Sequence, residues 1–290
     1  MAPQELINKI NNATHLGDVL DLTDWRKHYG DIARVLHPDV CKILGAADAF
    51  ARLNALKEGW EKGYRFTDDA GAVRAQNLTI TFVGDPKLLL QSYRNYGYLM
   101  SLNSPAAQHF KRYLPESMSL DAEVLTLNLR HRAAPLAGLI LQQGHANWIL
   151  SRLLEVTSWL AQEGWTHCGI NPESVFVVPE THGIILTSFY HLTPREGAVK
   201  TISAKYKNWY PDALFAKKIA EPFIDMELCK RTTAAILGDP SGLGMKLKLT
   251  HNKAFIDFLL TAHSDAFDCY DKYRKLLDKQ FPKKFLPLNL

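Results

Sequence analysis

The sequence predicts a mainly helical α+β chain, and three patterns of apolar residues support this class. Apolar side chains recur at helical spacing on both sides of residues 37–45, which indicates two amphipathic helices joined by a loop. Residues 78–83 alternate in polarity and are rich in branched side chains, as a strand is. Residues 145–162 have one long apolar helical face, and short apolar runs follow them. We therefore expect a helical N-terminal domain followed by a mixed domain.

Length and composition leave room for two domains. The chain has 290 residues, of which 47% are hydrophobic and 22% charged, values typical of a globular protein. We expect a first domain over residues 1–63, a turn-rich linker over 64–77 and a second domain over 78–290. The formal charge of +4 permits an acidic partner but falls short of a nucleic-acid-binding signature.

Cysteine spacing and hydropathy bear on the compartment. The four cysteines are far apart and form neither a CxxC pair nor a metal-ligand pattern, so we expect reduced thiols. They are Cys41, Cys168, Cys229 and Cys269. The first residues contain no apolar run of signal-peptide length, and no later run reaches about 18 apolar residues. We therefore expect a cytoplasmic protein that does not enter a membrane.

The tripeptide His37-Pro38-Asp39 lies between the two N-terminal helical patterns, which cover residues 25–36 and 46–60. Pro38 should end the first helix, because proline disfavours helical geometry in the residue before it. Two amphipathic helices joined by a short loop bury their apolar stripes against each other, so the loop should lie at the tip, in water. The tripeptide alone would fit any loop between helices, since turns favour proline and aspartate.

The residues around the tripeptide favour a more specific interpretation. Residues 29–39 read Tyr-Gly-Asp-Ile-Ala-Arg-Val-Leu-His-Pro-Asp and resemble the second helix and loop of the J domain of the DnaJ family. Residues 47–54 resemble the start of its third helix, and the first helix would lie within residues 4–21. The resemblance implies a three-helix domain that docks on the ATPase domain of a DnaK-class heat-shock chaperone and triggers ATP hydrolysis.

This resemblance also implies which residues make the chaperone contact. They are His37, Pro38 and Asp39 in the loop, with Arg26, Lys27 and Arg34 on the solvent side of the helix. The basic residues would present a positive stripe to an acidic groove, although most such residues form an ordinary solvated face. Gly30 and Asp31 stand where the family usually has further basic residues, so we expect weaker docking than that of a general-purpose co-chaperone.

The second half resembles a protein kinase at four landmarks in the family's order. Residues 164–178 look like the catalytic loop H-R-D-L-K-P-E-N and the strand after it, with matches at His167, Pro172 and Glu173. Residues 183–190 look like the strand that ends in D-F-G, and 210–212 resemble the A-P-E segment. Asp225 resembles the aspartate that opens the large buried helix of the kinase C-lobe.

The groups that perform phosphoryl transfer are missing from this kinase-like pattern. The reaction needs a carboxylate that accepts the substrate proton and oxygen ligands that hold magnesium. Gly169 stands at the place of the catalytic aspartate, Ser174 at that of the magnesium-binding asparagine, and Ser188 at that of the D-F-G aspartate. A glycine-rich loop and the phosphate-binding lysine are also missing, and we expect room for only one or two strands between Phe66 and Pro86.

We therefore interpret the second domain as a pseudokinase without enzymatic activity, cofactor or metal. Its N-lobe would be shortened to residues 78–134, and residues 135–290 would form a helical C-lobe. The ring of His167 should hold the loop backbone, and Asp225 should accept backbone N–H bonds. A Cys168–His167 nucleophile is a weaker option, since adjacent side chains in a strand-like loop point apart. A metal shared by His182 and His191 is weaker too, since no third ligand lies at a useful spacing.

The function favoured by these patterns is that of an adaptor. A J domain would recruit and stimulate a DnaK-class chaperone, and the pseudokinase would bind a client or another partner. One alternative is an atypical kinase or nucleotide-binding regulator. The other is a nucleic-acid-binding protein that uses the aromatic and basic residues 205–210 and the C-terminal Lys279, Lys283 and Lys284.

Overall fold

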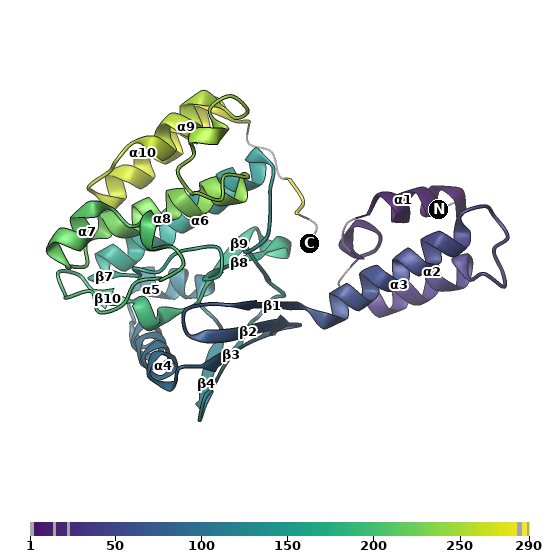
Figure 1. Ribbon diagram of the computed structural model, residues 1–290, viewed down its shortest axis with the longest axis horizontal. Helices are drawn as coiled ribbons and strands as arrows, with labels where there is room; N and C mark the ends of the chain where they lie inside the picture. Colours follow the sequence, from purple (N-terminus) through teal and green to yellow (C-terminus); the bar gives the residue numbers. More distant parts are fainter. Residues whose placement is uncertain (1–2, 14–15, 22–23, 283–285, 289) are drawn as a thin grey trace. The chain divides into compact units, whose positions relative to one another are not determined.

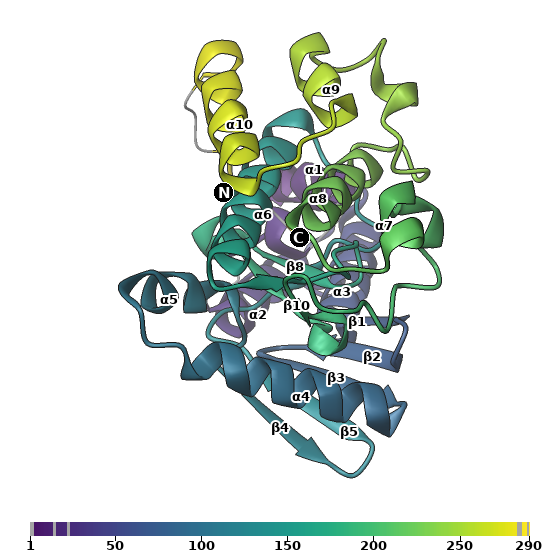
Figure 2. The ribbon, with the colours of Figure 1, turned by 90° about the vertical axis from the view of Figure 1, so that its left-hand side faces the viewer.

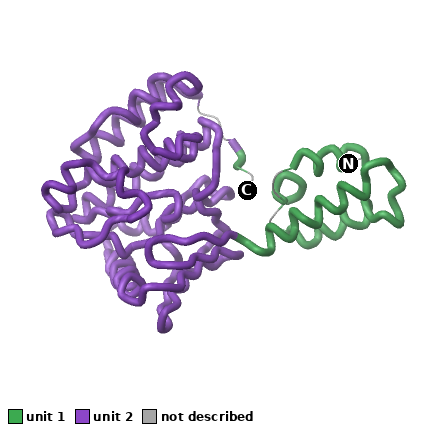
Figure 3. The backbone as a smooth tube through the Cα atoms, viewed as in Figure 1, with its two compact units in different colours: residues 1–63, 287–290 green, residues 64–286 purple. Residues whose placement is uncertain are grey.

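The computed structural model divides the chain into two compact units (Figures 1 and 3). The first unit comprises residues 1–63 and 287–290, and the second comprises residues 64–286. The structure describes residues 3–13, 16–21, 24–282, 286–288 and 290. Lys283 and Lys284, part of the basic C-terminal surface considered for nucleic-acid binding, lie outside the described residues.

Helices form the first unit. Its elements are α1 (Pro3–Asn12), a short 3-10 helix (Leu16–Asp18), α2 (Trp25–Leu36) and α3 (Ala46–Lys62). Figure 1 shows α2 and α3 running side by side, and both α1 and α2 pack against α3. Both helices expected around the His-Pro-Asp tripeptide are therefore present, and α1 begins one residue before the range 4–21 expected for the preceding helix and ends inside it.

The core of the first unit is built from the predicted apolar stripes. Its buried side chains come from all three helices and from the connection between α1 and α2. They are Leu6, Ile7, Ile10, Ala13, Leu16, Val19, Leu20, Leu36, Ala46, Ala49 and Leu53. Burying these aliphatic side chains supplies the main driving force for the unit. The larger aromatic residues of the stripes are only half buried against this core.

An antiparallel sheet opens the second unit, with strand order β1-β2-β3-β5-β4 among the described residues. The strands are β1 (Tyr64–Thr67), β2 (Gly71–Gln76), β3 (Thr79–Gly84), β4 (Ser117–Asp121) and β5 (Val124–Asn128). The expected linker over 64–77 is therefore wrong, because these residues form two paired strands of the sheet. The second unit starts at residue 64 and not at 78, and β1, β2 and β3 precede residue 86 where one or two strands were expected.

A helix covers the sheet. It is α4 (Pro86–Ser101), which starts at an Asp85 N-cap that accepts hydrogen bonds from two backbone N–H groups. Figure 2 shows α4 lying across the strands, and its buried residues include Leu89, Tyr96 and Leu99. The short helix α5 (Pro105–Phe110) and a 3-10 turn (Lys111–Tyr113) then connect α4 to β4.

The remainder of the second unit is mainly helical. Its helices are α6 (Gln143–Gln162), α7 (Asp212–Lys217), α8 (Pro222–Ile236), α9 (Lys253–Leu260) and α10 (Ala266–Gln280). Its strands are β6 (Ala134–Pro135), β7 (Trp165–Thr166), β8 (Val175–Val178), β9 (Gly183–Leu186) and β10 (Thr193–Pro194). Short 3-10 helices cover Pro179–Thr181, Phe189–His191, Lys207–Trp209 and Met245–Leu247. The helix α6 packs against both α8 and α10, which places the core of this part between the three helices.

The mainly helical α+β class is confirmed, since about 51% of the chain is helical and the larger sheet is antiparallel. Helices formed where apolar residues recur at helical spacing, as in α4 and α6. In the part of the chain that the structure describes, no helix is both long enough and apolar enough to cross a membrane.

The turn between β1 and β2 packs closely on the end of β3. A Cβ atom added at Gly84 would lie 1.9 Å from the carbonyl oxygen of Ala70, which accepts a hydrogen bond from the N–H of Asp85. Gly71 in the same turn has φ +145°, a conformation that other residues rarely adopt. The two glycines therefore allow the close approach of the two backbones.

We expect Gly84→Ala to lower the free energy of unfolding by about 1–3 kcal/mol, because the added methyl group meets backbone that cannot move aside. Gly97→Ala is the matched control, since a Cβ atom on this exposed position of α4 meets no neighbour within 4 Å. That change should raise the free energy by about 1 kcal/mol through helix propensity. Urea unfolding of both variants measures the difference, and equal stability of Gly84→Ala and the parent would contradict the close packing.

Candidate functional site

The His37-Pro38-Asp39 turn follows directly from the end of α2. His37 leaves helical geometry, with φ −56° and ψ 133°, as expected for the residue before a proline. Its carbonyl oxygen accepts hydrogen bonds from the N–H groups of Val40 and Cys41, at 2.8 and 2.9 Å. The ring Nδ1 of His37 lies 3.3 Å from the N–H of Asp39, and the ring contacts Phe50 edge-on. The turn is thus fixed by its own hydrogen bonds and by one contact with α3.

The turn is exposed to solvent. The side chain of His37 is 47% exposed and that of Asp39 is 87% exposed, while Leu36 just before them is buried. Pro38 is exposed as well. A partner could therefore reach all three side chains without any rearrangement of the helices.

The three basic residues of α2 differ in how they are paired. Arg26 is exposed and lies over the ring of Trp25. Lys27 is also exposed. Arg34 is 81% exposed and forms an ion pair of 3.0 Å with Asp31, one turn earlier on the same helix. The positive stripe expected on α2 is therefore partly offset by a carboxylate of the same helix.

In the second unit, a buried carboxylate holds the backbone of His167 and Cys168. Asp225 at the start of α8 accepts hydrogen bonds from the backbone N–H groups of His167 and Cys168, at 2.6 and 2.8 Å. Burial raises the pKa of Asp225 to about 7, and the two N–H donors oppose that rise. Cys168 has φ +58°, in the left-handed region that costs free energy for residues other than glycine. The expected role of Asp225 as an acceptor of backbone bonds agrees with this geometry.

His167 connects this loop to the end of β9. Its Nε2 atom donates to the carbonyl oxygen of Thr187 at 3.0 Å, so the ring holds backbone as expected. Burial, and next the neighbouring His191, lower the pKa of His167 to about 3, so the ring is neutral. Cys168 is fully buried and burial raises the pKa of its thiol well above the usual value, which disfavours the thiolate that a nucleophile needs.

The ring of His191 lies against Gly169, the position that the kinase resemblance aligned with a catalytic aspartate. A Cβ atom at Gly169 would lie 2.4 Å from the ring of His191, so any side chain there would displace that ring. His191 is buried, and its Nε2 atom donates to Asp69 at 3.3 Å while Nδ1 lies 3.0 Å from the hydroxyl of Thr201. The packing at Gly169 therefore excludes a carboxylate without rearrangement of this histidine.

Ser174 and Ser188 stand where the kinase resemblance would place magnesium ligands, and both form hydrogen bonds within the chain. The hydroxyl of Ser174 accepts from the N–H of Asn171 at 2.9 Å. The hydroxyl of Ser188 donates to Asp68 at 3.1 Å, and the hydroxyl of Tyr190 donates to the same oxygen at 2.7 Å. Each serine is buried. Both hydroxyls thus take part in hydrogen bonds within the chain.

Asp68 lies in the turn between β1 and β2. Its other carboxyl oxygen accepts from the N–H groups of Ala70 and Gly71, at 2.9 and 3.1 Å. Burial raises the pKa of Asp68, and the hydrogen bonds from Tyr190, Ala70, Ser188 and Gly71 act in the opposite direction. The hydroxyl donors come from Ser188 and Tyr190, so the turn is fastened to the segment that follows β9.

The neighbouring Asp69 fastens the same turn to a second segment. It accepts from His191 and from the N–H of Ala204, the latter at 2.9 Å. Burial alone would raise the pKa of Asp69, but hydrogen bonds from His191, Ser203 and Ala204 outweigh it and lower the pKa. Glu173 connects the residues before β8 to the same second segment, since its buried carboxylate binds the ammonium of Lys205 and the hydroxyl of Tyr206.

Sequence reasoning missed Asp68 and Asp69, because residues 64–77 were interpreted as a linker. A signal was present. An Asp-Asp-Ala-Gly run between two short alternating segments is typical of a hairpin turn. Their partners lie more than 100 residues further along the chain, and no local pattern indicates such a contact.

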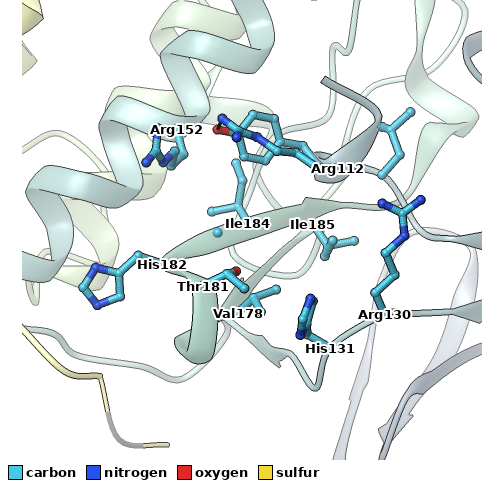
Figure 4. Close-up of a pocket in the computed structure, with 12 residues that line it drawn as sticks. Arg112, Arg130, His131, Arg152, Val178, Thr181, His182, Ile184 and Ile185 are labelled. Carbon is cyan, nitrogen blue, oxygen red and sulfur yellow. Dashed lines mark hydrogen bonds between the residues drawn. The ribbon is translucent and has the colours of Figure 1, made fainter. Parts of the chain in front are cut away.

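A separate cavity of about 180 Å³ lies beside β8 and β9 (Figure 4). Three arginines line it, namely Arg112, Arg130 and Arg152. Arg112 and Arg152 both approach Glu155, at 3.9 and 3.0 Å, and Arg130 lies 3.6 Å from Glu116. Two carboxylates thus offset most of the positive charge at this cavity. Among the described residues, no group of three or more His, Cys, Asp or Glu side chains could hold a metal ion.

We expect the raised pKa of Asp225 to appear in the pH dependence of stability. Between about pH 4 and pH 7 the folded chain keeps a proton on Asp225 that the unfolded chain has already released. This group therefore lowers the free energy of unfolding as pH rises, by up to about 1.4 kcal/mol per pH unit. Asp225→Asn removes the titrating group. Urea unfolding across this range should show the parent losing stability relative to the variant, and parallel profiles would contradict the raised pKa.

The chain was compared with protein-family models and with curated proteins. No protein-family model matches the chain, and no curated protein matches it at a significant level. Function is therefore inferred from the residues of the chain and their contacts.

Proposed function

We propose that this protein is a co-chaperone-type adaptor. Residues 1–63 act as a J domain that recruits a DnaK-class heat-shock chaperone and stimulates its ATPase. Residues 64–286 act as a catalytically inactive kinase-like domain that binds a client or another partner. The observation that supports the proposal most strongly is the exposed His37-Pro38-Asp39 turn at the end of the packed helices α2 and α3.

The geometry of the turn suits a contact surface. The turn is ordered by bonds from the N–H groups of Val40 and Cys41 to His37, while its side chains stay exposed. A partner that binds a preordered turn loses less conformational entropy on binding than one that must order a mobile loop. Arg26 and Lys27 add exposed positive charge on α2, which would speed the approach to an acidic groove.

Pairing within α2 supports weak electrostatic attraction to the chaperone. Arg34 is paired with Asp31, so its charge is available to a partner only if that pair opens. Surface ion pairs of this kind contribute only about 0–1 kcal/mol to stability, so opening the Arg34–Asp31 pair costs little free energy. The ATPase domain would therefore meet two readily available cations on this helix and a third that is shared.

Two contacts support the kinase-like interpretation of the second unit. The ring of His167 holds the backbone before Ser188, and Asp225 holds the loop that contains His167. A sheet with one helix packed on it precedes a mainly helical part, in keeping with an N-lobe and a C-lobe. The N-lobe in this proposal begins at residue 64.

The contacts at the kinase-like positions argue against phosphoryl transfer. Transfer needs a carboxylate next to the substrate hydroxyl and oxygen ligands for magnesium. The ring of His191 lies against Gly169, and Ser188 already donates to Asp68. The β1–β2 turn is bonded directly to residues 188–191, where the magnesium ligand of a kinase would lie. We therefore assign the second unit a binding function without catalysis.

We expect His37→Gln to abolish the stimulation of a DnaK-class ATPase, because the ring that shapes the exposed turn is lost while the core is untouched. The measurement is steady-state ATP hydrolysis by the chaperone with increasing amounts of the full chain. Melting temperature and helix content should stay the same, as is usual for exposed positions.

His109→Gln is the matched control for this experiment. His109 is 50% exposed, close to the 47% of His37, but it lies on α5 of the second unit. This control should stimulate the ATPase as the parent does. Equal stimulation of the ATPase by His37→Gln and by the parent would contradict the J-domain assignment.

We expect ATP with Mg²⁺ to leave the melting temperature of the chain unchanged. A nucleotide present at about 100 times its Kd would stabilise the folded state by about 2.7 kcal/mol, which a thermal melt detects easily. A clear rise in melting temperature with ATP and Mg²⁺ would instead support a nucleotide-binding regulator. ADP with Mg²⁺ and Mg²⁺ alone serve as the controls for nucleotide type and for the cation.

A further inference from the structure

The cavity of about 180 Å³ beside β8 and β9 is lined by cations and apolar side chains, and we name it the arginine cavity (Figure 4). Its cations are Arg112, Arg130 and Arg152, and none of the described residues that line it carries a carboxylate. Its apolar wall includes the buried residues Leu114, Val178, Ile184 and Ile185. The volume is roughly ten times what a single water needs, so the cavity admits a small organic molecule.

The cations lie at two ends of the arginine cavity. Figure 4 shows Arg152 and Arg130 on opposite sides, with residues 184–185 of β9 between them. Arg112 belongs to the end of Arg152, because the two guanidinium groups approach the carboxylate of Glu155, at 3.9 and 3.0 Å respectively. The arginine cavity thus has a first end with two arginines, a second end with one arginine, and an apolar middle.

The first end has a surplus of positive charge. Glu155 accepts from Arg152 at 3.0 Å and from the hydroxyl of Tyr113 at 2.8 Å, and both bonds use the same carboxyl oxygen. Arg112 donates to that hydroxyl at 2.9 Å and lies over the ring of Tyr113, which fixes the direction of its side chain. One carboxylate offsets one of the two guanidinium charges, and each guanidinium has several further N–H donors. The first end can therefore bind one more anionic group.

The second end offers one cation whose partner within the chain is weakly held. The Nε atom of Arg130 lies 3.6 Å from Glu116, too far for a hydrogen bond, and both side chains are more than half exposed. Exposed pairs contribute little to stability, so an incoming anion can replace Glu116. His131 lies 3.0 Å from Glu180, and burial lowers the pKa of His182, which favours its neutral ring. The second end therefore presents a single positive charge to a ligand.

We propose that the arginine cavity binds a short aliphatic dicarboxylate, with one carboxylate at Arg112 and Arg152 and the other at Arg130. The planar guanidinium fork fits the two oxygens of a carboxylate. Each end offers about one positive charge, which matches a carboxylate better than a phosphate monoester with its charge of about −1.5 to −2. The apolar residues 184–185 between the ends bury the methylene groups of the ligand. This site does not depend on the proposed contact with a chaperone.

The test is isothermal titration calorimetry of the full chain with succinate, glutarate and adipate, which differ in the distance between their two carboxylates. We expect a Kd below about 1 mM for at least one of them. Butyrate has a single carboxylate and should bind at least about tenfold more weakly, because it leaves one end without a charged partner. Inorganic phosphate should also bind more weakly than the best dicarboxylate.

Arg130→Gln and Arg152→Gln each remove one guanidinium, from different ends of the cavity. Each should raise the Kd of the best dicarboxylate about tenfold or more. Arg94→Gln is the matched control, since Arg94 is an exposed arginine of α4 outside the cavity lining, and this variant should bind as the parent does. Thermal melting without ligand checks the fold, and Arg130→Gln should melt as the parent does because its side chain is more than half exposed.

The proposal is overturned if no dicarboxylate binds at millimolar concentration, or if butyrate binds as tightly as the best dicarboxylate. Inorganic phosphate binding as tightly as that dicarboxylate would show a phosphate site and overturn the assignment of the ligand. Unchanged affinity of the folded Arg130→Gln variant would show that the ligand does not reach the second end, which also contradicts the proposal. None of these results bears on the co-chaperone function, since stimulation of the ATPase is measured separately.

Discussion

The second unit depends on one buried carboxylate. Asp225 accepts the N–H groups of His167 and Cys168, and so holds in place a loop that has little regular structure of its own. Without those two bonds, the left-handed backbone at Cys168 would relax, since it costs about 1–3 kcal/mol. The fixed loop brings the ring of His167 to the carbonyl of Thr187, which joins the loop to the end of β9. Burial and two backbone donors thus hold His167 and Cys168 against the start of α8, and His167 extends that contact to the end of β9.

The carboxylates around this loop are used for structure. Asp68 receives two hydroxyl donors and two N–H donors of the chain, and Glu173 binds Lys205 and Tyr206. A carboxylate that is saturated with internal donors has little capacity left for a metal ion or a substrate proton. Together with Asp69, these side chains fasten the β1–β2 turn to the residues after β9 and to residues 204–206.

The helices and the exposed turn could be predicted from the sequence, whereas most of the contacts in the second unit could not. Apolar residues at helical spacing indicated α2, α3, α4 and α6, and the proline at position 38 indicated where α2 ends. The strands β1 and β2 were missed because their alternation is short and rich in alanine, glycine and arginine, which are poor strand signals. The bonds from Asp68 to Ser188 and Tyr190 join positions about 120 residues apart, and spacing within one segment contains no information on such pairs.

The exposed turn of the first unit follows from the packing of its helices together with the proline and the hydrogen bonds of the loop itself. The loop between α2 and α3 meets the core only in part, through Cys41, and the ring of His37 contacts Phe50 of α3. Polar residues would satisfy that position without any cost in stability, yet Val40 and Leu44 occupy it. Neither side chain contributes to the core of its own unit, so their effect on folding is close to neutral. An apolar group that does not stabilise the folded chain can still lower the free energy of a complex. This difference between folding and binding favours a binding role for the loop.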